Sequence, residues 1–234
     1  MPVSGARTDL PHTRATAEGL KGLLGPSARD SGRTHGIMTP ALPTVPDETV
    51  TAWALAAAGG DGEAVDRFVR ALQRDVRRYV TYLANDTQAA DDLTQDTFLR
   101  ALTALPRFEG RSSARVWLLS IARRAVADGL RRAASRPRLA HTEDWQSAAE
   151  RAQPAGLPGF DEGIALMELV GALPGDRREA FVLTQLLGLP YAEAAEVGRC
   201  PVGTVRSRVS RARTALAEWL ADETASPPAE PAMA

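Results

Sequence analysis

The segment from Arg199 to Leu220 separates apolar and basic residues onto different sides of a helix. Its apolar residues recur every three or four positions and are Val202, Val205, Val209, Ala212 and Leu216. That spacing places residues on one face of an α-helix. The first fifteen positions also hold five arginines and no acid. Because the apolar face must pack against other elements, we predict a long helix with a cationic outer side.

A shorter helix precedes this one and favours a helix-turn-helix. Tyr191 to Val197 has a helical pattern that Gly198 is expected to close. A short helix, a tight turn and a longer basic helix form the arrangement in which the second helix enters the major groove of DNA. On that second helix, the side opposite the apolar stripe carries Gly203, Thr204, Ser207, Ser210 and Arg211, with Arg206, Arg208 and Arg213 at its flanks. The alternative is a solvated basic helix face without a ligand.

Composition excludes several classes of function. The net charge is −1, so the basic character is local. The single cysteine, Cys200, is expected to be a small buried apolar residue in the turn. His12, His35 and His141 are scattered without ligand spacing, so the sequence predicts no metal site and no cofactor. The sequence has neither the ~18 apolar residues of a membrane span nor a signal peptide, which predicts a cytoplasmic protein without membrane contact.

Helical periodicity and the absence of strand patterns predict an all-α protein of two small domains joined by a flexible linker. Within the first domain we expect an Ala-rich helix around Trp53 and helices near 63–84, 89–105 and 112–134. The predicted organisation is a disordered N-terminal extension (1–46), a first helical domain (47–136), a linker (137–160), a second helical domain (161–223) and a disordered tail (224–234).

One helix of the first domain is acidic on its outer side. Its acids, which precede the first base at Arg100, are Asp86, Asp91, Asp92 and Asp96. Phe98, Leu102 and Leu105 are expected to mark its buried face, with Asp92, Gln95, Asp96 and Leu99 on a neighbouring face. The helix dipole would favour Asp91 and Asp92 near the start of the helix, and it explains Asp96 less well.

A second basic segment lies in the same domain. Residues 107–138 hold nine arginines and two acids, a local balance of +7. Arg124 and Arg131 are seven positions apart and share a helix face, which gives an electrostatic footprint for nucleic acid. Ser112 or Ser113 is expected to cap this helix. Phe108, in the preceding loop, either contacts an unstacked base or is a buried aromatic anchor.

Three motifs in this order resemble the extracytoplasmic-function (ECF) sigma factors, a group of bacterial RNA polymerase specificity subunits. They are DDLTQDTFLRAL, RFEGRSSARVWLLSIARR and ALPGDRREAFVLTQLLGLPYAEAAEVGRCPVGTVRSRVSRARTAL. The resemblance covers residues 48–222 and is greatest to actinobacterial members of the sigma C type. It implies a sigma region 2 bundle, a sigma region 4 helix-turn-helix, and promoter recognition and melting by a protein that is not itself an enzyme.

The resemblance also implies roles for individual residues. Docking on the coiled coil of the largest polymerase subunit would involve Asp92, Leu93, Gln95, Asp96, Phe98 and Leu99. The minus-ten element would be bound by Ala104, Phe108, Glu109, Gly110, Arg111, Ser112, Ser113, Arg123, Arg124 and Arg131. The minus-thirty-five element would be bound by Thr204, Arg206, Ser207, Arg208, Ser210, Arg211 and Arg213.

The implied partners are core RNA polymerase, through its coiled coil and flap, and promoter DNA, with an anti-sigma factor left open. The alternative function is a helix-turn-helix regulator that is not a polymerase subunit. That alternative would leave the acidic helix and the second basic segment without a purpose.

Overall fold

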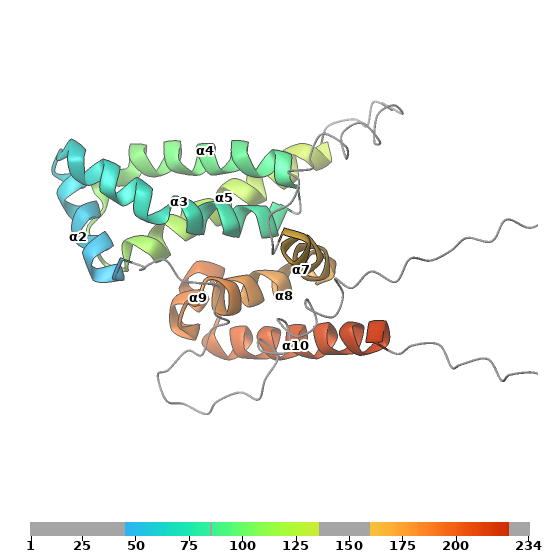
Figure 1. Cartoon of the computed structure of the whole chain (residues 1–234). Coiled ribbons are helices and arrows are strands. Elements are labelled where there is room, and N and C mark those ends of the chain that lie inside the picture. The colour runs from blue at the N-terminus through green and yellow to red at the C-terminus, as the bar shows by residue number, and fades with distance from the viewer. Residues whose placement is uncertain (1–44, 85, 136–159, 225–234) are drawn as a thin grey trace, which may run out of the picture.

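The structure is a computed structural model that describes residues 45–84, 86–135 and 160–224 (Figure 1). Every regular element within these ranges is a helix, and the predicted all-α class with two small domains is confirmed. Most of the predicted N-terminal extension, linker and tail lies outside the described residues.

The first domain contains α2 (Asp47–Ala58), α3 (Gly62–Ala84), α4 (Thr87–Ala104), a single 3-10 turn η1 (Leu105–Arg107) and α5 (Ala114–Ser135). Helix α3 lies among the other three helices and packs against each of them. The Asp61 carboxylate caps α3, because its Oδ1 accepts the main-chain N–H groups of Glu63 and Ala64 at 2.9 and 3.1 Å. Phe68 and Leu118 are fully buried in the resulting core.

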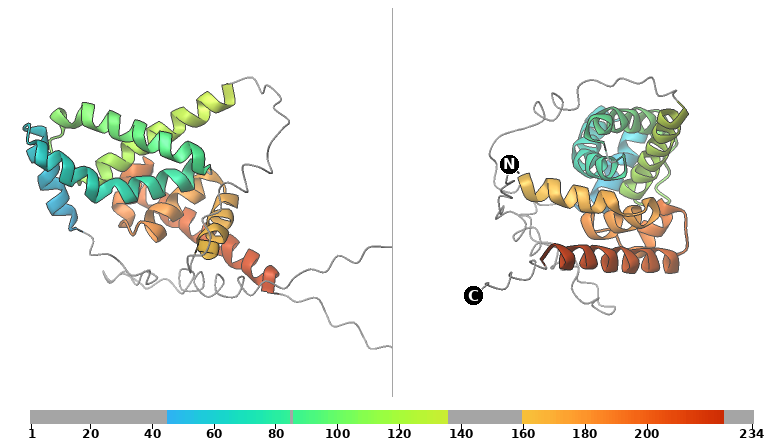
Figure 2. Two further views of the ribbon diagram at one scale, coloured as in Figure 1. Left: turned by 45° about the horizontal axis from the view of Figure 1, so that its top comes forward. Right: turned by 90° about the vertical axis from the view of Figure 1, so that its right-hand side faces the viewer.

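The second domain contains α7 (Phe160–Ala172), α8 (Gly175–Phe181), a π-helical turn η2 (Val182–Leu186), α9 (Tyr191–Gly198) and α10 (Val202–Thr224). The predicted apolar stripe of α10 is confirmed, because four of its five residues are buried and Val202 is half-buried. Helix α10 lies on the side of the molecule farthest from α4 (Figures 1 and 2). The stripe therefore faces the rest of the second domain and leaves the basic side outward.

Two local predictions were wrong. Helix α9 includes Gly198, and it is Arg199 that takes the left-handed conformation after the helix, with φ of 50°. Leu102 is 37% exposed, and the buried face of α4 instead consists of Ala90, Thr94, Thr97 and Ala101. These residues are small or polar, and the two threonine hydroxyls donate to carbonyls of their own helix, each at 2.7 Å. A search for large apolar residues misses such a face.

Gly129 of α5 allows α4 to approach α5 closely. At Gly129 of α5, a Cβ atom would lie only 2.8 Å from Cδ2 of Leu93. Any larger residue at this position would push the two helices apart or displace the leucine. The acidic helix and the basic helix of the first domain are thus closely packed.

Polar contacts join the two domains, with α5 packed on α9 and α3 packed on α8 (Figure 2). The buried Glu179 carboxylate accepts the Tyr79 hydroxyl at 2.8 Å and Arg123 Nε at 2.6 Å. Burial and the neighbouring Glu179 charge raise the pKa of Tyr79 well above its ordinary value of 10.0, so the hydroxyl stays a donor. Nearby, Arg115 Nη2 donates to the Leu187 carbonyl at 2.7 Å.

We predict that Glu179→Ala destabilises the protein more than Tyr79→Phe. The first change leaves a fully buried hydroxyl without an acceptor and costs about 1–3 kcal/mol of unfolding free energy. The second removes donor and hydrogen bond together and costs about 0.5–1.5 kcal/mol. Urea unfolding followed by circular dichroism measures both. Equal losses would contradict the assignment of Glu179 as the shared acceptor.

Candidate nucleic-acid interface

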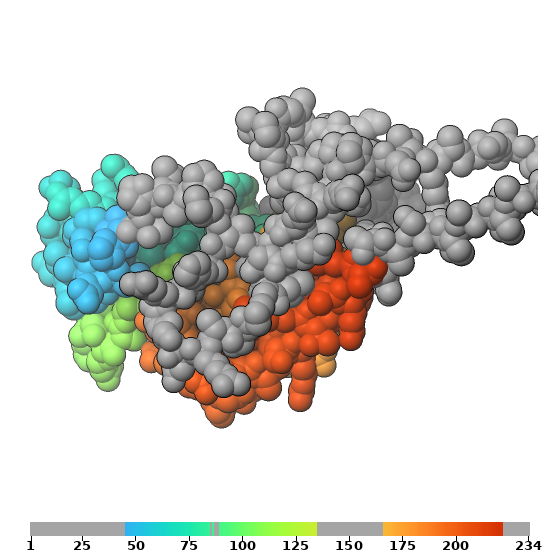
Figure 3. Space-filling view, turned by 60° about the horizontal axis from the view of Figure 1, so that its bottom comes forward, coloured from blue at the N-terminus to red at the C-terminus, as the bar shows by residue number. Residues whose placement is uncertain are grey.

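The outer side of α10 presents a row of polar and cationic side chains. Arg206, Ser207, Ser210 and Arg211 are exposed, and α10 (red) forms much of the face seen in Figure 3. The Ser207 hydroxyl donates to the Thr204 carbonyl at 2.9 Å, which fixes its position and leaves its oxygen free to accept. The first acid of α10 is Glu218, so this row carries no negative charge. Such a surface suits base edges and phosphates in a DNA groove.

Two arginines of α10 turn toward the protein instead. Arg208 Nε lies 3.1 Å from the Asp176 carboxylate of α8, and Arg208 Nη1 donates to Cys200 Sγ at 3.5 Å. Arg213 Nη2 donates to Gln185 Oε1 in η2 at 2.7 Å. Both arginines therefore hold α10 against its own domain. Cys200 is half-buried against the core, and there it accepts this contact from Arg208.

The loop before α5 is anchored from below by an aromatic residue. Phe108 is 7% exposed, and its ring centroid lies 4.9 Å from that of Trp117. The sequence left open whether Phe108 contacts an unstacked base or is a buried anchor, and in the structure it is a buried anchor. Ser113 caps α5, because its Oγ accepts the Val116 N–H at 3.2 Å. Gly110 takes a φ of 69°, which favours glycine in this tight loop.

The arginines of α5 differ in their surroundings. Arg124 is exposed and has no ion pair within the described ranges, whereas Arg123 donates to Glu179 of the second domain. Arg131 is exposed and donates to the Asp128 carboxylate. Ala104, at the end of α4, is half-buried. Arg111, in the loop before α5, lies with its Nε 3.2 Å from the Glu109 carboxylate. Of the four arginines expected at the minus-ten element, Arg124 alone has no ion pair in the described part of the chain.

The outer side of α4 combines acids with exposed leucines. Asp92 and Gln95 are exposed. Leu99 lies farther along the same helix, and its side chain is 60% exposed. Leu102 continues this surface, and sequence reasoning missed it by placing it in the core. Leu93 and Phe98 are half-buried and support the surface from below. Exposed leucines beside carboxylates are typical of a protein-binding surface.

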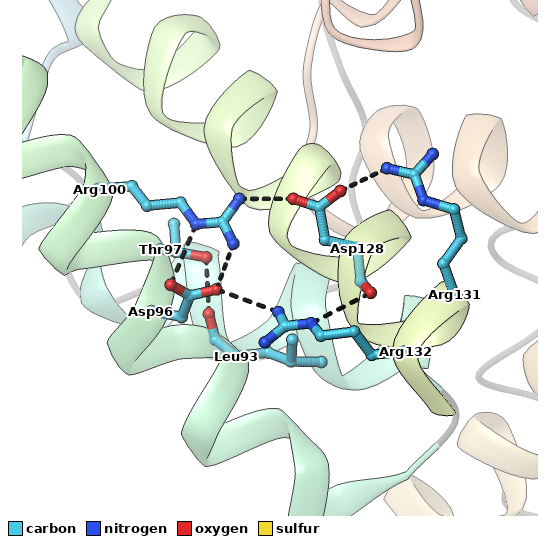
Figure 4. Close-up of polar contacts among 7 residues, drawn as sticks. All are labelled: Leu93, Asp96, Thr97, Arg100, Asp128, Arg131 and Arg132. Atoms are coloured by element: carbon cyan, nitrogen blue, oxygen red, sulfur yellow. Dashed lines mark hydrogen bonds and ion pairs between the residues drawn. The ribbon is translucent and has the colours of Figure 1, made fainter. Parts of the chain in front are cut away.

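Asp96 belongs to an ionic bridge between α4 and α5 (Figure 4). Its carboxylate accepts Arg100 Nε at 3.0 Å and lies 2.8 Å from Arg100 Nη2, while Arg100 Nη1 donates to Asp128 at 2.7 Å. The hydrogen bonds that Asp128 accepts from Arg100 and Arg131 lower the pKa of Asp128. The hydrogen bonds that Arg100 donates to Asp128 and Asp96 raise the pKa of Arg100. The helical spacing of Asp96 and Arg100 was visible in the sequence, but the role of Asp128 was not.

Comparison with known proteins decides the family. Residues 68–136 match Sigma-70 region 2 and residues 164–216 match Sigma-70, region 4. The ECF RNA polymerase sigma factor SigC of Mycobacterium tuberculosis is 53% identical over 170 residues, which cover 73% of this chain and 90% of that protein. The chain belongs to the ECF sigma factors. The ECF RNA polymerase sigma-E factor of Escherichia coli is 34% identical, covering 67% of this chain and 86% of that protein.

Solved structures agree with the assignment. CnrH in complex with the cytosolic domain of CnrY aligns with a TM-score of 0.58 and 26% identity, over 74% of this chain and 98% of that one. RpoE of Bartonella quintana in complex with the anti-sigma factor NepR aligns with a TM-score of 0.54 and 24% identity, over 67% of this chain and 96% of that one, which supports the fold alone.

As an ECF sigma factor, the chain binds core RNA polymerase and promoter DNA to initiate transcription. A helix-turn-helix regulator that acts apart from polymerase would not match Sigma-70 region 2, so that alternative is not supported. None of the helices in the described ranges combines the length and apolar character that crossing a membrane requires.

The two kinds of arginine on α10 should differ in their effect on stability. Arg213→Ala removes the donor to Gln185 Oε1 and should lower the unfolding free energy by about 1 kcal/mol. Arg211→Ala changes an exposed side chain and should stay within about 0.5 kcal/mol of the unmodified protein. Thermal unfolding of both variants measures the difference, and an equal loss in the two would contradict the inward role of Arg213.

Proposed function

We propose that this sigma factor binds core polymerase through the outer side of α4. The residues are those expected from the sequence, Asp92, Leu93, Gln95, Asp96, Phe98 and Leu99. The main support is the 60% exposure of Leu99 beside Asp92 and Gln95, because an exposed leucine costs free energy that a bound partner removes. Leu102 extends this docking surface. The coiled coil of the largest subunit is the proposed contact, with the flap contacting the second domain.

The minus-ten element is proposed to bind along α5 and the loop before it. Exposed Glu109 and Arg111 border the loop, Gly110 shapes it, and Phe108 supports it from the core. Arg124 and Arg131 are proposed to contact phosphates. Arg123 reaches DNA only after Glu179 has released it, since the two form a 2.6 Å hydrogen bond.

The minus-thirty-five element is proposed to bind the outer side of α10. The observation that carries this proposal is its acid-free row of exposed donors, Arg206, Ser207, Ser210 and Arg211. Thr204 lies near the start of the helix, where a phosphate contact is favoured. Arg208 and Arg213 act indirectly here, because they fix the angle at which α10 is presented.

The two DNA surfaces need not bind tightly by themselves. Polymerase holds both on one assembly, so the second contact forms at a high effective concentration. Capture of an extruded base would offset an unstacking cost of a few kcal/mol during strand opening. The chain is proposed to perform no covalent chemistry. The cytoplasm remains its predicted location, and an anti-sigma factor, left open by the sequence, is proposed as a further partner.

We predict that Leu99→Ala weakens binding to core polymerase by about tenfold, since buried apolar anchors dominate protein interfaces. The unfolding free energy of the variant should equal that of the unmodified protein, because Leu99 is exposed. Leu55→Ala is the matched control, because Leu55 is 44% exposed but lies on α2. Binding is measured with labelled sigma factor and purified core enzyme. A loss as large in the Leu55 variant, or none in the Leu99 variant, would refute the docking proposal.

Reading of the minus-thirty-five element should depend on Arg211. Arg211→Ala is expected to reduce discrimination between matched and mutated elements by about 1–3 kcal/mol, as for loss of a bidentate guanine contact. Arg213→Ala should weaken holoenzyme binding to both elements alike, because it loosens the whole helix. If the Arg211 variant also loses equal affinity on both elements, Arg206, Ser207 and Ser210 must do the reading.

A further inference from the structure

The ionic bridge of Figure 4 extends beyond Asp96, Arg100 and Asp128. Arg132 of α5 lies at one end of it, with Nη2 3.7 Å from Asp96 Oδ2 and Nε donating to the Asp128 carbonyl at 3.3 Å. Arg131 lies at the other end and donates to the Asp128 carboxylate. Charges therefore alternate along the bridge, and three arginines share two carboxylates.

Arg132 makes the longest ion pair of the bridge. Its side chain is 66% exposed, and its ion pair with Asp96 is longer than both contacts that Asp96 makes with Arg100. Arg132 directly follows Arg131, which is proposed to contact the DNA backbone. An exposed guanidinium at this place suits a phosphate, but the Asp96 charge opposes that contact.

We propose that Arg132 is an additional phosphate-binding residue, and that Asp96 restrains it until core polymerase engages the Asp96 carboxylate. Polymerase then competes with Arg132 for Asp96, while the two closer contacts keep Arg100 in place. The released guanidinium binds the DNA backbone. No helix has to move, because the exchange is one of charge partners. This inference rests on the proposed docking role of Asp96.

The expected coupling is modest and reciprocal. Exposed ion pairs of this kind change an equilibrium by about two- to fivefold. DNA bound at Arg132 would raise the affinity of Asp96 for polymerase by the same factor. Docking and DNA binding thus reinforce each other across the α4–α5 pair.

The first test measures the isolated chain on DNA. Asp96→Asn keeps an oxygen for Arg100 but removes the charge that restrains Arg132. It should tighten binding to a short fluorescein-labelled DNA duplex of mixed sequence by about two- to fivefold. The dependence of log affinity on log salt should steepen by about one. Unchanged binding would overturn the proposal.

Two controls separate release of Arg132 from a general change in charge. In an Arg132→Gln background, Asp96→Asn should give no gain, and a gain that persists would overturn the proposal. Asp91→Asn makes the same charge change on α4 but releases Arg77 of α3, which lies 3.1 Å from Asp91. It should leave DNA binding unchanged, and a gain equal to that of Asp96→Asn would also overturn the proposal.

A second test leaves Asp96 intact. Arg132→Gln should weaken DNA binding more in the reconstituted holoenzyme than in the isolated chain, because Arg132 is released only after docking. Equal losses would overturn the proposal. Binding of Asp96→Asn to core polymerase is measured in parallel. If Asp96→Asn weakens docking but leaves DNA binding unchanged, this inference alone is overturned. If Asp96→Asn leaves docking unchanged but tightens DNA binding, the docking role of Asp96 is overturned, and the coupling with it.

Discussion

The buried carboxylate of Glu179 decides how the two domains of this sigma factor lie together. It accepts a hydroxyl from α3 and a guanidinium from α5, so one side chain of α8 fixes two helices of the other domain. An unpaired carboxylate in this place would be costly, and its two donors come from residues 100 and 56 positions away. The same contact engages Arg123, a residue of the proposed DNA surface, in the packing of the two domains.

Arginines with similar sequence surroundings serve two different purposes in this protein. On α10, Arg206 and Arg211 stay in solvent, whereas Arg208 and Arg213 bind Asp176 and Gln185 of the same domain. The inward pair fixes the helix, and the outward pair is left for DNA. Positive charge thus positions the reading helix as well as providing its contacts, and a count of basic residues overstates the number available to phosphates.

The first domain combines close packing with ionic contacts between α4 and α5. Gly129 lets Leu93 approach, and the bridge through Asp96, Arg100 and Asp128 spans the same pair of helices. The proposed polymerase surface and the proposed minus-ten surface are therefore carried by two helices that are packed and ionically bridged to each other. Such packing suits a protein that must hold melted DNA at a fixed place on the polymerase.

The sequence by itself determined the helices of the first domain, the buried stripe of α10 and the family, and it narrowed the cap of α5 to Ser112 or Ser113, because these depend on local spacing and on motifs that lie within one segment. It misplaced Leu102, since the core face of α4 is made of alanines and threonines that carry little apolar signal. It left open whether Phe108 is buried. Only the tertiary structure decided that Phe108 packs on Trp117, that Arg123 binds Glu179 and that Asp96 is bridged to Asp128 through Arg100. These contacts join residues on different helices, and their geometry exists only once the helices have packed.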